Sequence, residues 1–277
     1  PEYINGFFAR AYVHKELKFF KKSIDDFDKI LEIDSSNSLA KLGKGLVYLL
    51  LGDFKMGFSF YEYRKHHPEF YKVFSKDEIQ KLVNCNNLYN KKILIIGEQG
   101  LGDNIQFSRY IFLLINLGAK IFFQVENKFK DFFKRIYPDL KIYSKEEVLP
   151  DYHYASSLLS LPFLFNTSIE NIPKPQYNLN VDNSTFKKWA KYFNKDKINI
   201  GINWHSNPLS NIVGRSVPLK YFFELSKSEK IQLYSLQKFD DNEKKKIDKN
   251  FNIISFKKDL DKDETFFDTS VIMMNLD

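Results

Sequence analysis

The chain has 277 residues, enough for two or three domains that each bury a core of their own. Hydrophobic residues make up 43% of the chain and aromatic residues 17%, which excludes a protein that is disordered for lack of apolar side chains. The formal net charge is +7, but lysines are spread along the whole chain, and the densest run, Lys244 to Lys249, has acidic neighbours. We therefore expect a solvated helix face there and no nucleic-acid partner.

The first 70 residues contain an internal repeat. Residues of similar character recur 34 positions apart, which is the tetratricopeptide period: Ala11 with Gly45, Phe20 with Phe54, Ser23 with Gly57, and Phe27 with Tyr61. The spacing predicts four antiparallel helices stacked as two hairpins, in a helical module of residues 1–75. Two repeats are fewer than usually stand alone, so we expect the module to pack on the next domain or to continue beyond Pro1. Grooves of such repeats often hold peptides, so a peptide or protein partner is expected there.

Cys85 is the single cysteine, which excludes an internal disulfide and fits a reducing compartment. No apolar run approaches the roughly 20 residues of a membrane-spanning helix, and the first residues lack the layout of a signal peptide. We therefore expect a cytoplasmic protein without a transmembrane segment.

From Lys92 the sequence pattern changes to that of a strand, a glycine-rich loop, a helix and a second strand, as in a parallel α/β sheet. A first cycle has expected strands at 93–96 and 121–125 and helices at 105–117 and 129–137. A second has expected helices at 186–193 and 268–276 and strands at 198–204, 231–236 and 253–256. Pro173 and Pro175 lie between the cycles and suggest a linker. The pattern predicts two doubly wound lobes, residues 76–180 and 181–277.

The most informative stretch runs from Gly97 through Gly100 and Gly102 to Asp103, between a strand and a helix, where α/β sheets bind ligands. A dinucleotide-binding loop is one interpretation, but the glycines run G-x-x-G-x-G, the reverse of that fingerprint. Asp103 would also place a carboxylate where a pyrophosphate needs positive potential. No Gly-Lys-Ser/Thr follows, which excludes a Walker loop. Asp103 to Gln106 also fits a capping box that starts the next helix, so a purely structural role stays open.

This stretch resembles the first motif of tetratricopeptide-containing relatives of the bacterial heptosyltransferases, glycosyltransferase family nine. Further segments occur in the order typical of that family: Tyr61 to Arg64, Ser157 to Pro162, Gly201 to Trp204 with Asn207 and Pro208, Arg215 to Leu219, and Ser235 to Gln237. The resemblance covers essentially the whole chain. It implies tetratricopeptide hairpins followed by the two lobes of a GT-B fold, with the C-terminal lobe truncated at Asp277.

The resemblance implies metal-independent transfer of a sugar, with inversion, from a nucleotide-sugar donor to a glycan or protein acceptor, and no cofactor. Asp103 would be the catalytic base, since transfer needs a group that takes the proton of the acceptor hydroxyl. The other expected acceptor-side residues are Glu98, Gln99, Gly100, Gly102, Gln106 and Arg109. The expected donor-binding residues are Trp204, Asn207, Arg215, Ser216 and Gln237.

In this family the chain continues beyond the equivalent of Asp277 with a segment that completes the donor pocket. We therefore expect the 277 residues to be an inactive fragment of the enzyme. A second hypothesis is a non-catalytic binding protein, in which the repeats recruit a partner and the transferase fold has decayed. Loss of the donor-pocket segment from the sequence beyond Asp277 would favour it.

Overall fold

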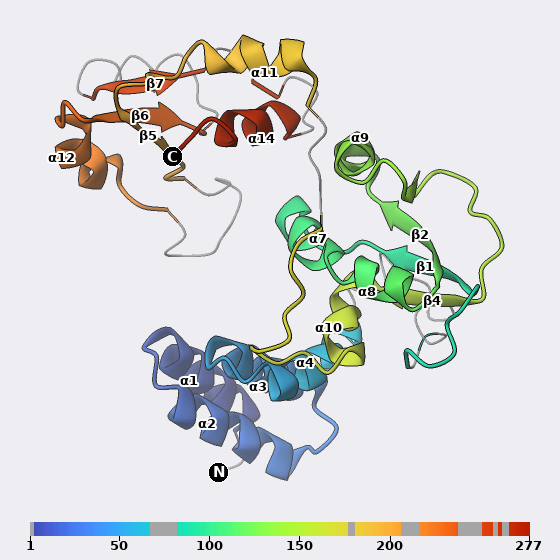
Figure 1. Ribbon diagram of the computed structural model, residues 1–277. Coiled ribbons are helices and arrows are strands. Elements are labelled where there is room, and N and C mark those ends of the chain that lie inside the picture. Colours follow the sequence, from blue (N-terminus) through green and yellow to red (C-terminus); the bar gives the residue numbers. More distant parts are fainter. Residues whose placement is uncertain are drawn as a thin grey trace. The chain divides into compact units, whose positions relative to one another are not determined.

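The computed structural model describes residues 3–66, 82, 84–176, 181–205, 216–237, 251–256, 260–261 and 266–277. The chain divides into two compact units, Pro1–Asn178 and Leu179–Asp277, shown in Figure 1. The described residues contain helices and two parallel sheets. The expected mixed class, helical followed by parallel α/β, is confirmed at this level.

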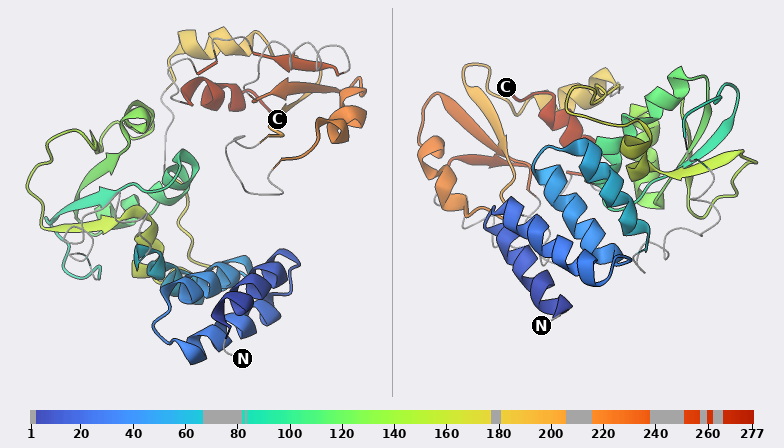
Figure 2. Two further views of the ribbon diagram at one scale, coloured as in Figure 1. Left: turned by 180° about the vertical axis from the view of Figure 1, so that it is seen from behind. Right: turned by 90° about the horizontal axis from the view of Figure 1, so that it is seen from below.

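Four helices form the start of the first unit: α1 (Ile4–Glu16), α2 (Phe20–Ile33), α3 (Ser38–Leu50) and α4 (Phe54–Tyr61), followed by the 3₁₀ turn η1 (Glu62–His66). Consecutive helices pack side by side, as Figures 1 and 2 show. A Cβ on Gly43 would lie 2.4 Å from Cζ of Phe27, so this glycine lets α3 approach α2. Residues 3–66 are named the helical module; the four expected helices are confirmed, and the described part of this segment contains no strand.

A four-stranded parallel sheet comes next, in the order β3-β2-β1-β4. Its strands are β1 (Lys92–Ile96), β2 (Lys120–Val125), β3 (Lys141–Ser144) and β4 (Tyr154–Ser157). The expected strands at 93–96 and 121–125 are confirmed, whereas β3 and β4 were not predicted. Helix α9 (Asn127–Ile136) follows β2, and η2 (Leu158–Ser160) and α10 (Leu161–Leu164) follow β4. Buried Leu94, Ile96, Phe122 and Ala155 form one core cluster of this sheet.

The helix expected at 105–117 differs from the observed structure. Two helices occupy this region, α7 (Leu101–Ser108) and α8 (Ile111–Asn116). Helix α7 begins four residues early because Gly100 adopts extended backbone and serves as its N-cap. At the other end, the Ser108 hydroxyl donates to the Ile105 carbonyl at 2.8 Å, a local bond that competes with a continuous helix. Gly118, with φ of +81°, follows α8 in the left-handed region.

The second unit contains a three-stranded parallel sheet in the order β5-β6-β7, from β5 (Ile198–Ile202), β6 (Ile231–Ser235) and β7 (Ile253–Ser255). Helices α11 (Asn183–Ala190) and α14 (Phe267–Met273) pack together through a core with Trp189 and Val271. The segment η3 (Leu219–Phe222) and α12 (Phe223–Ser226) lies on the other side of the sheet, as Figure 2 shows. The strands and helices expected in this unit are confirmed within the described residues, with slightly different ends.

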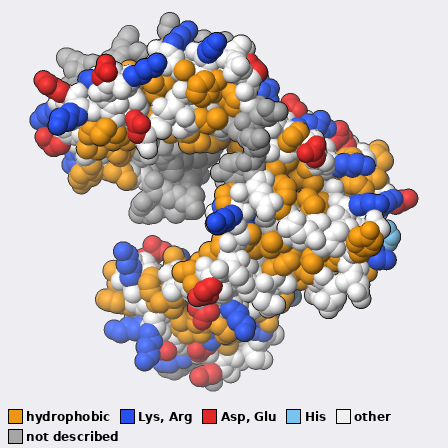
Figure 3. All heavy atoms as spheres, viewed as in Figure 1, with side chains coloured by type: hydrophobic (Ala, Val, Ile, Leu, Met, Phe, Trp, Pro, Cys, Tyr) orange, Lys and Arg blue, Asp and Glu red, His pale blue; other side chains and the backbone are white. Residues whose placement is uncertain are grey.

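No described helix is long and apolar enough to cross a bilayer. On the face drawn in Figure 3, Lys and Arg side chains are interspersed with Asp and Glu over the described surface. The positive net charge is thus not gathered into one patch on this face.

Candidate functional site

The loop that joins β1 to α7, residues 97–100, is named the glycine loop. It leaves the carboxyl end of β1, which lies between two parallel neighbours, the place where α/β sheets bind ligands. Gly97 is buried, and its N–H donates to the Gln124 carbonyl at 2.7 Å. A Cβ there would lie 2.2 Å from Oδ1 of Asn104, so only glycine fits without displacing that side chain.

Asn104 fixes the shape of the glycine loop from inside α7. Its side chain is 2% exposed, and Nδ2 donates to the carbonyls of Glu98 at 2.9 Å and Gly100 at 2.8 Å. Gln99, between them, has a φ of +61°, a left-handed conformation that costs energy in a residue other than glycine. The two bonds from Asn104 hold the backbone on both sides of this strained residue.

Asp103 is the third residue of α7, and its Oδ2 accepts from the N–H of the N-cap Gly100 at 3.1 Å. The predicted capping arrangement, with Asp103 at the cap and Gln106 as its partner, is therefore wrong in register, because the helix begins earlier. The Asp103 side chain is half-buried, and its Oδ1 has no hydrogen bond among the described residues. One carboxylate oxygen is thus held at the helix N-terminus while the second stays available.

Tyr61, the last residue of α4, reaches the glycine loop from the helical module. The side-chain amide of Gln99 donates to its hydroxyl at 2.7 Å. Burial raises the pKa of Tyr61, and the negative charges of Glu98 and Asp103 add to this effect. Tyr61 is therefore a neutral hydroxyl at physiological pH, close enough to Asp103 to feel its charge. In the sequence, Tyr61 stood out only as a repeat and motif position.

The side chain of Glu98, the second residue of the glycine loop, is buried, with 4% of the residue's surface exposed. Arg64 of the helical module donates to its Oε1 at 2.6 Å and its Oε2 at 3.1 Å. The hydroxyl of Ser157 and the N–H of Leu159 also donate to Oε1, at 2.5 and 3.1 Å. Glu98, expected to shape the acceptor side, thus binds the loop to the helical module and to the end of β4.

Arg64 is the centre of this buried network, with 5% of its surface exposed. Besides Glu98 it donates to the hydroxyls of Ser157 at 2.7 Å and Ser160 at 3.0 Å, and to Glu62 at 2.7 Å. Although burial opposes its charge, the two carboxylates raise the pKa of Arg64. Burial likewise opposes the charged form of Glu62, but Arg64 and Lys65 lower its pKa. The sequence offered one signal: Arg64 and the serines occur in motif segments, without any indication that they touch.

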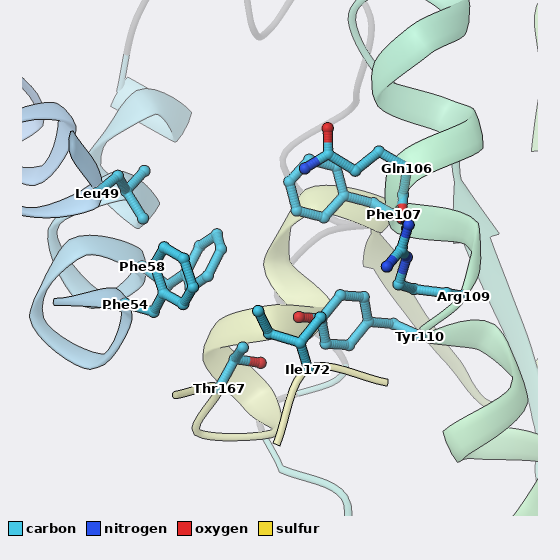
Figure 4. Close-up of a pocket in the computed structure, with 9 residues that line it drawn as sticks. All are labelled: Leu49, Phe54, Phe58, Gln106, Phe107, Arg109, Tyr110, Thr167 and Ile172. Carbon is cyan, nitrogen blue, oxygen red and sulfur yellow. Dashed lines mark hydrogen bonds between the residues drawn. The ribbon is translucent and has the colours of Figure 1, made fainter. Parts of the chain in front are cut away.

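Gln106 and Arg109, both expected on the acceptor side, border one pocket in the first unit. Figure 4 shows the pocket between the helical module on one side and α7 with the segment around Thr167 on the other. Its volume is about 210 Å³. It is lined by Leu49, Phe54, Phe58, Gln106, Phe107, Arg109, Tyr110, Thr167 and Ile172, and is named the aromatic pocket. Gly102, in contrast, faces open space, since a Cβ there would meet nothing within 4 Å.

In the second unit, several residues expected to bind the donor lie at the carboxyl ends of β5 and β6. Oε1 of Gln237 accepts from the His205 N–H at 3.0 Å. Ser216 is exposed, and the N–H of its neighbour Val217 donates to the Trp204 carbonyl at 2.8 Å. Trp204 is 4% exposed and packs with Ile202 in the core, so it has a structural role. Asn207 and Arg215 lie outside the described residues.

Comparisons with known proteins give no match to any protein-family model, curated protein or solved structure. Within the described residues, no group of three or more His, Cys, Asp and Glu side chains is placed to hold a metal ion.

Proposed function

We propose that the chain belongs to a glycosyltransferase of the GT-B type, with tetratricopeptide hairpins at its N-terminal side, that moves a sugar from a nucleotide-sugar donor to an acceptor hydroxyl. One observation carries the proposal: Asp103 has one oxygen fixed by the Gly100 N–H and the second unoccupied within the described structure. It stands at the carboxyl edge of a parallel sheet, where ligands of α/β proteins bind. A carboxylate held in this way is pre-positioned to accept a proton.

In this reaction the acceptor oxygen attacks the anomeric carbon as the bond from that carbon to the donor phosphate breaks. Asp103 accepts the proton of the acceptor hydroxyl, and the leaving nucleoside diphosphate takes the bonding electrons. The anomeric carbon becomes cation-like in the transition state, so a nearby carboxylate also stabilises it electrostatically. Attack on the face opposite the leaving group inverts the configuration. Tyr61 and Gln99 border this position and would contact the acceptor.

The second unit would hold the donor. Ser216 and Gln237 come from segments that a parallel sheet brings to one edge, and the hydroxyl of Ser216 and the side-chain amide of Gln237 would donate to phosphate oxygens. Arg215 would pair with the diphosphate, since a guanidinium binds phosphate oxygens bidentately. These contacts need no metal ion.

The test is Asp103→Asn in the full-length protein. Asparagine keeps a side-chain oxygen for the Gly100 N–H and gives up the negative charge in the first turn of α7, which contributes about 0.3 to 1 kcal/mol, so the fold and donor binding should be retained. Asparagine does not accept a proton at neutral pH, so transfer should slow by roughly 10² to 10⁴-fold, or about 3 to 5 kcal/mol of barrier. Release of nucleoside diphosphate from a panel of nucleotide sugars measures this.

The matched control is Asp182→Asn. Asp182 caps α11 by accepting from the Thr185 N–H at 2.8 Å, so it undergoes the same chemical change at another helix start. This variant should keep full turnover. Near wild-type turnover of Asp103→Asn would assign Asp103 to helix capping alone and remove the basis of the proposal.

A further inference from the structure

The aromatic pocket has no role in the proposed chemical step. Its walls come from the helical module, through Leu49, Phe54 and Phe58, and from α7 and the residues after it, through Phe107 and Tyr110 (Figure 4). The Phe58 and Phe107 rings meet edge to face at 6.3 Å and join the two sides. Most of the lining is therefore aromatic or aliphatic.

Arg109 supplies the positive charge at this pocket. Its Nε donates to the Gln106 carbonyl at 2.8 Å, and its Nη1 makes a longer contact of 3.5 Å with the Pro173 carbonyl. Across the described part of the chain, Arg109 forms no salt bridge with a carboxylate. Its guanidinium thus retains donors for an anionic group that enters beside the pocket.

We propose that the aromatic pocket binds an aromatic or branched aliphatic side chain of a polypeptide acceptor, and that Arg109 pairs with an adjoining Asp or Glu of that acceptor. The proposal rests on the proposed function and names its acceptor class. A cavity of about 150 Å³ holds one benzene ring, so about 210 Å³ fits one large side chain. It is too small for the chain of a lipid carrier. A sugar that filled the pocket would bond to Gln106, Arg109 and Thr167 on its polar side but would bury its other hydroxyl groups against the apolar side chains.

The position of the pocket relative to Asp103 supports this assignment. Asp103 and Phe107 are separated by about one turn of α7, roughly 6 Å along the helix axis. An extended peptide advances roughly 3.3 Å per residue. A Ser or Thr hydroxyl two or three residues from the anchored side chain would therefore reach the free oxygen of Asp103.

The probe is the fluorescein-labelled peptide Gly-Ser-Gly-Phe-Asp-Gly. Fluorescence anisotropy measures its binding to the full chain in the absence of a nucleotide-sugar donor. Ile172→Trp fills the pocket from a loop position that is 40% exposed, and Arg109→Glu reverses the charge beside it. The matched controls are Met56→Trp and Lys55→Glu, two exposed positions of α4 that do not line the pocket. Thermal unfolding confirms that each variant is folded.

Both pocket variants should bind the peptide at least about tenfold more weakly. Replacing Phe by Ser or Asp by Asn in the peptide should have the same effect. Both control variants should bind the peptide like the wild type. Equal binding by the pocket variants, or by the peptide without Phe, would overturn the proposal. Binding of dodecyl phosphate or maltohexaose at the pocket in place of the peptide would overturn it as well. Because no donor is present, Asp103→Asn should bind the peptide normally, so failure of the pocket and failure of the base are separate results.

Discussion

Replacing Arg64 by Leu should strongly destabilise the first unit. The substitution removes two hydrogen bonds to Glu98 and one each to Ser157, Ser160, Glu62 and the Tyr61 carbonyl, all from a side chain that is almost fully buried. The Glu98 carboxylate stays buried and keeps the Ser157 hydroxyl and the Leu159 N–H as hydrogen-bond donors. Removing one partner of a buried ion pair costs about 3 to 5 kcal/mol. Since domains are stable by about 5 to 15 kcal/mol, the loss is a large share of the total.

A double-mutant cycle separates the ion pair from simple loss of packing. Arg64→Leu leaves the buried Glu98 carboxylate without its guanidinium, and Glu98→Leu leaves the buried Arg64 with Glu62 as its carboxylate partner. The double variant removes both members of the Arg64–Glu98 pair. The double variant should therefore lose at least about 2 kcal/mol less than the sum of the single variants. Arg64→Lys should lose most of the stability that Arg64→Leu loses. One ammonium group cannot replace the guanidinium fork, which reaches both Glu98 oxygens and the two serines.

Urea unfolding offers an internal control for this cycle. Both tryptophans, Trp189 and Trp204, lie in the second unit, so their fluorescence follows that unit, while far-ultraviolet circular dichroism also follows the helices of the first. Arg64→Leu should shift the dichroism transition of the first unit to lower urea and leave the fluorescence transition in place. A loss below about 1 kcal/mol, or additive losses in the double variant, would refute the assigned role of the network.

Two further predictions concern the helical module and the glycine loop. Hydrogen bonding to Arg10 lowers the pKa of Asp26 in the folded protein. The ionised carboxylate therefore stabilises the fold at pH values above its unfolded-state pKa of about 3.9, and this contribution is lost as the pH falls through its folded-state pKa. The stability gap between wild type and Asp26→Asn in urea unfolding should therefore narrow below about pH 4; a constant gap would contradict this. Gly97→Ala should cost about 1 to 3 kcal/mol by displacing Asn104, whereas Gly102→Ala, which faces open space, should change stability by about 0.5 kcal/mol or less. Equal losses from the two glycine variants would show that Gly97 is not sterically required.

The repeat and the longer strands were readable because their signals are local. The 34-residue spacing reflects small residues where helices approach closely: a Cβ on Gly45 would lie 2.8 Å from Cβ of Phe60, and a Cβ on Gly57 would lie 2.6 Å from Cδ2 of Leu49. Strand β1 is a run of four buried aliphatic residues. Strands β3 and β4 have only four residues each, and β4 carries two buried serines, so neither gives an apolar pattern. The hydroxyl of Ser157 is buried because Arg64 and Glu98 satisfy it, a fact about residues far away in the sequence.

The position of Asp103 was predicted better than its local geometry. Its place after a strand and a glycine-rich loop is confirmed, whereas its assignment as the catalytic base came from the family resemblance and stays a prediction. The start of α7 was misplaced because Gly100, which caps the helix, has no side chain to mark the boundary. Sequence spacing gave no sign that Glu98 pairs with Arg64, which lies 34 residues earlier in the chain.

The contacts of the glycine loop make the helical module part of the candidate site. Tyr61 bonds to Gln99, Arg64 pairs with Glu98, and the Phe58 ring packs on Phe107. Two of these are polar and directional, and the ion pair is buried, where desolvation cancels much of its attraction. Such a pair contributes orientation more than net stability. The module therefore helps to set the conformation of the loop that precedes Asp103, and a partner that moves η1 would change that loop through Arg64.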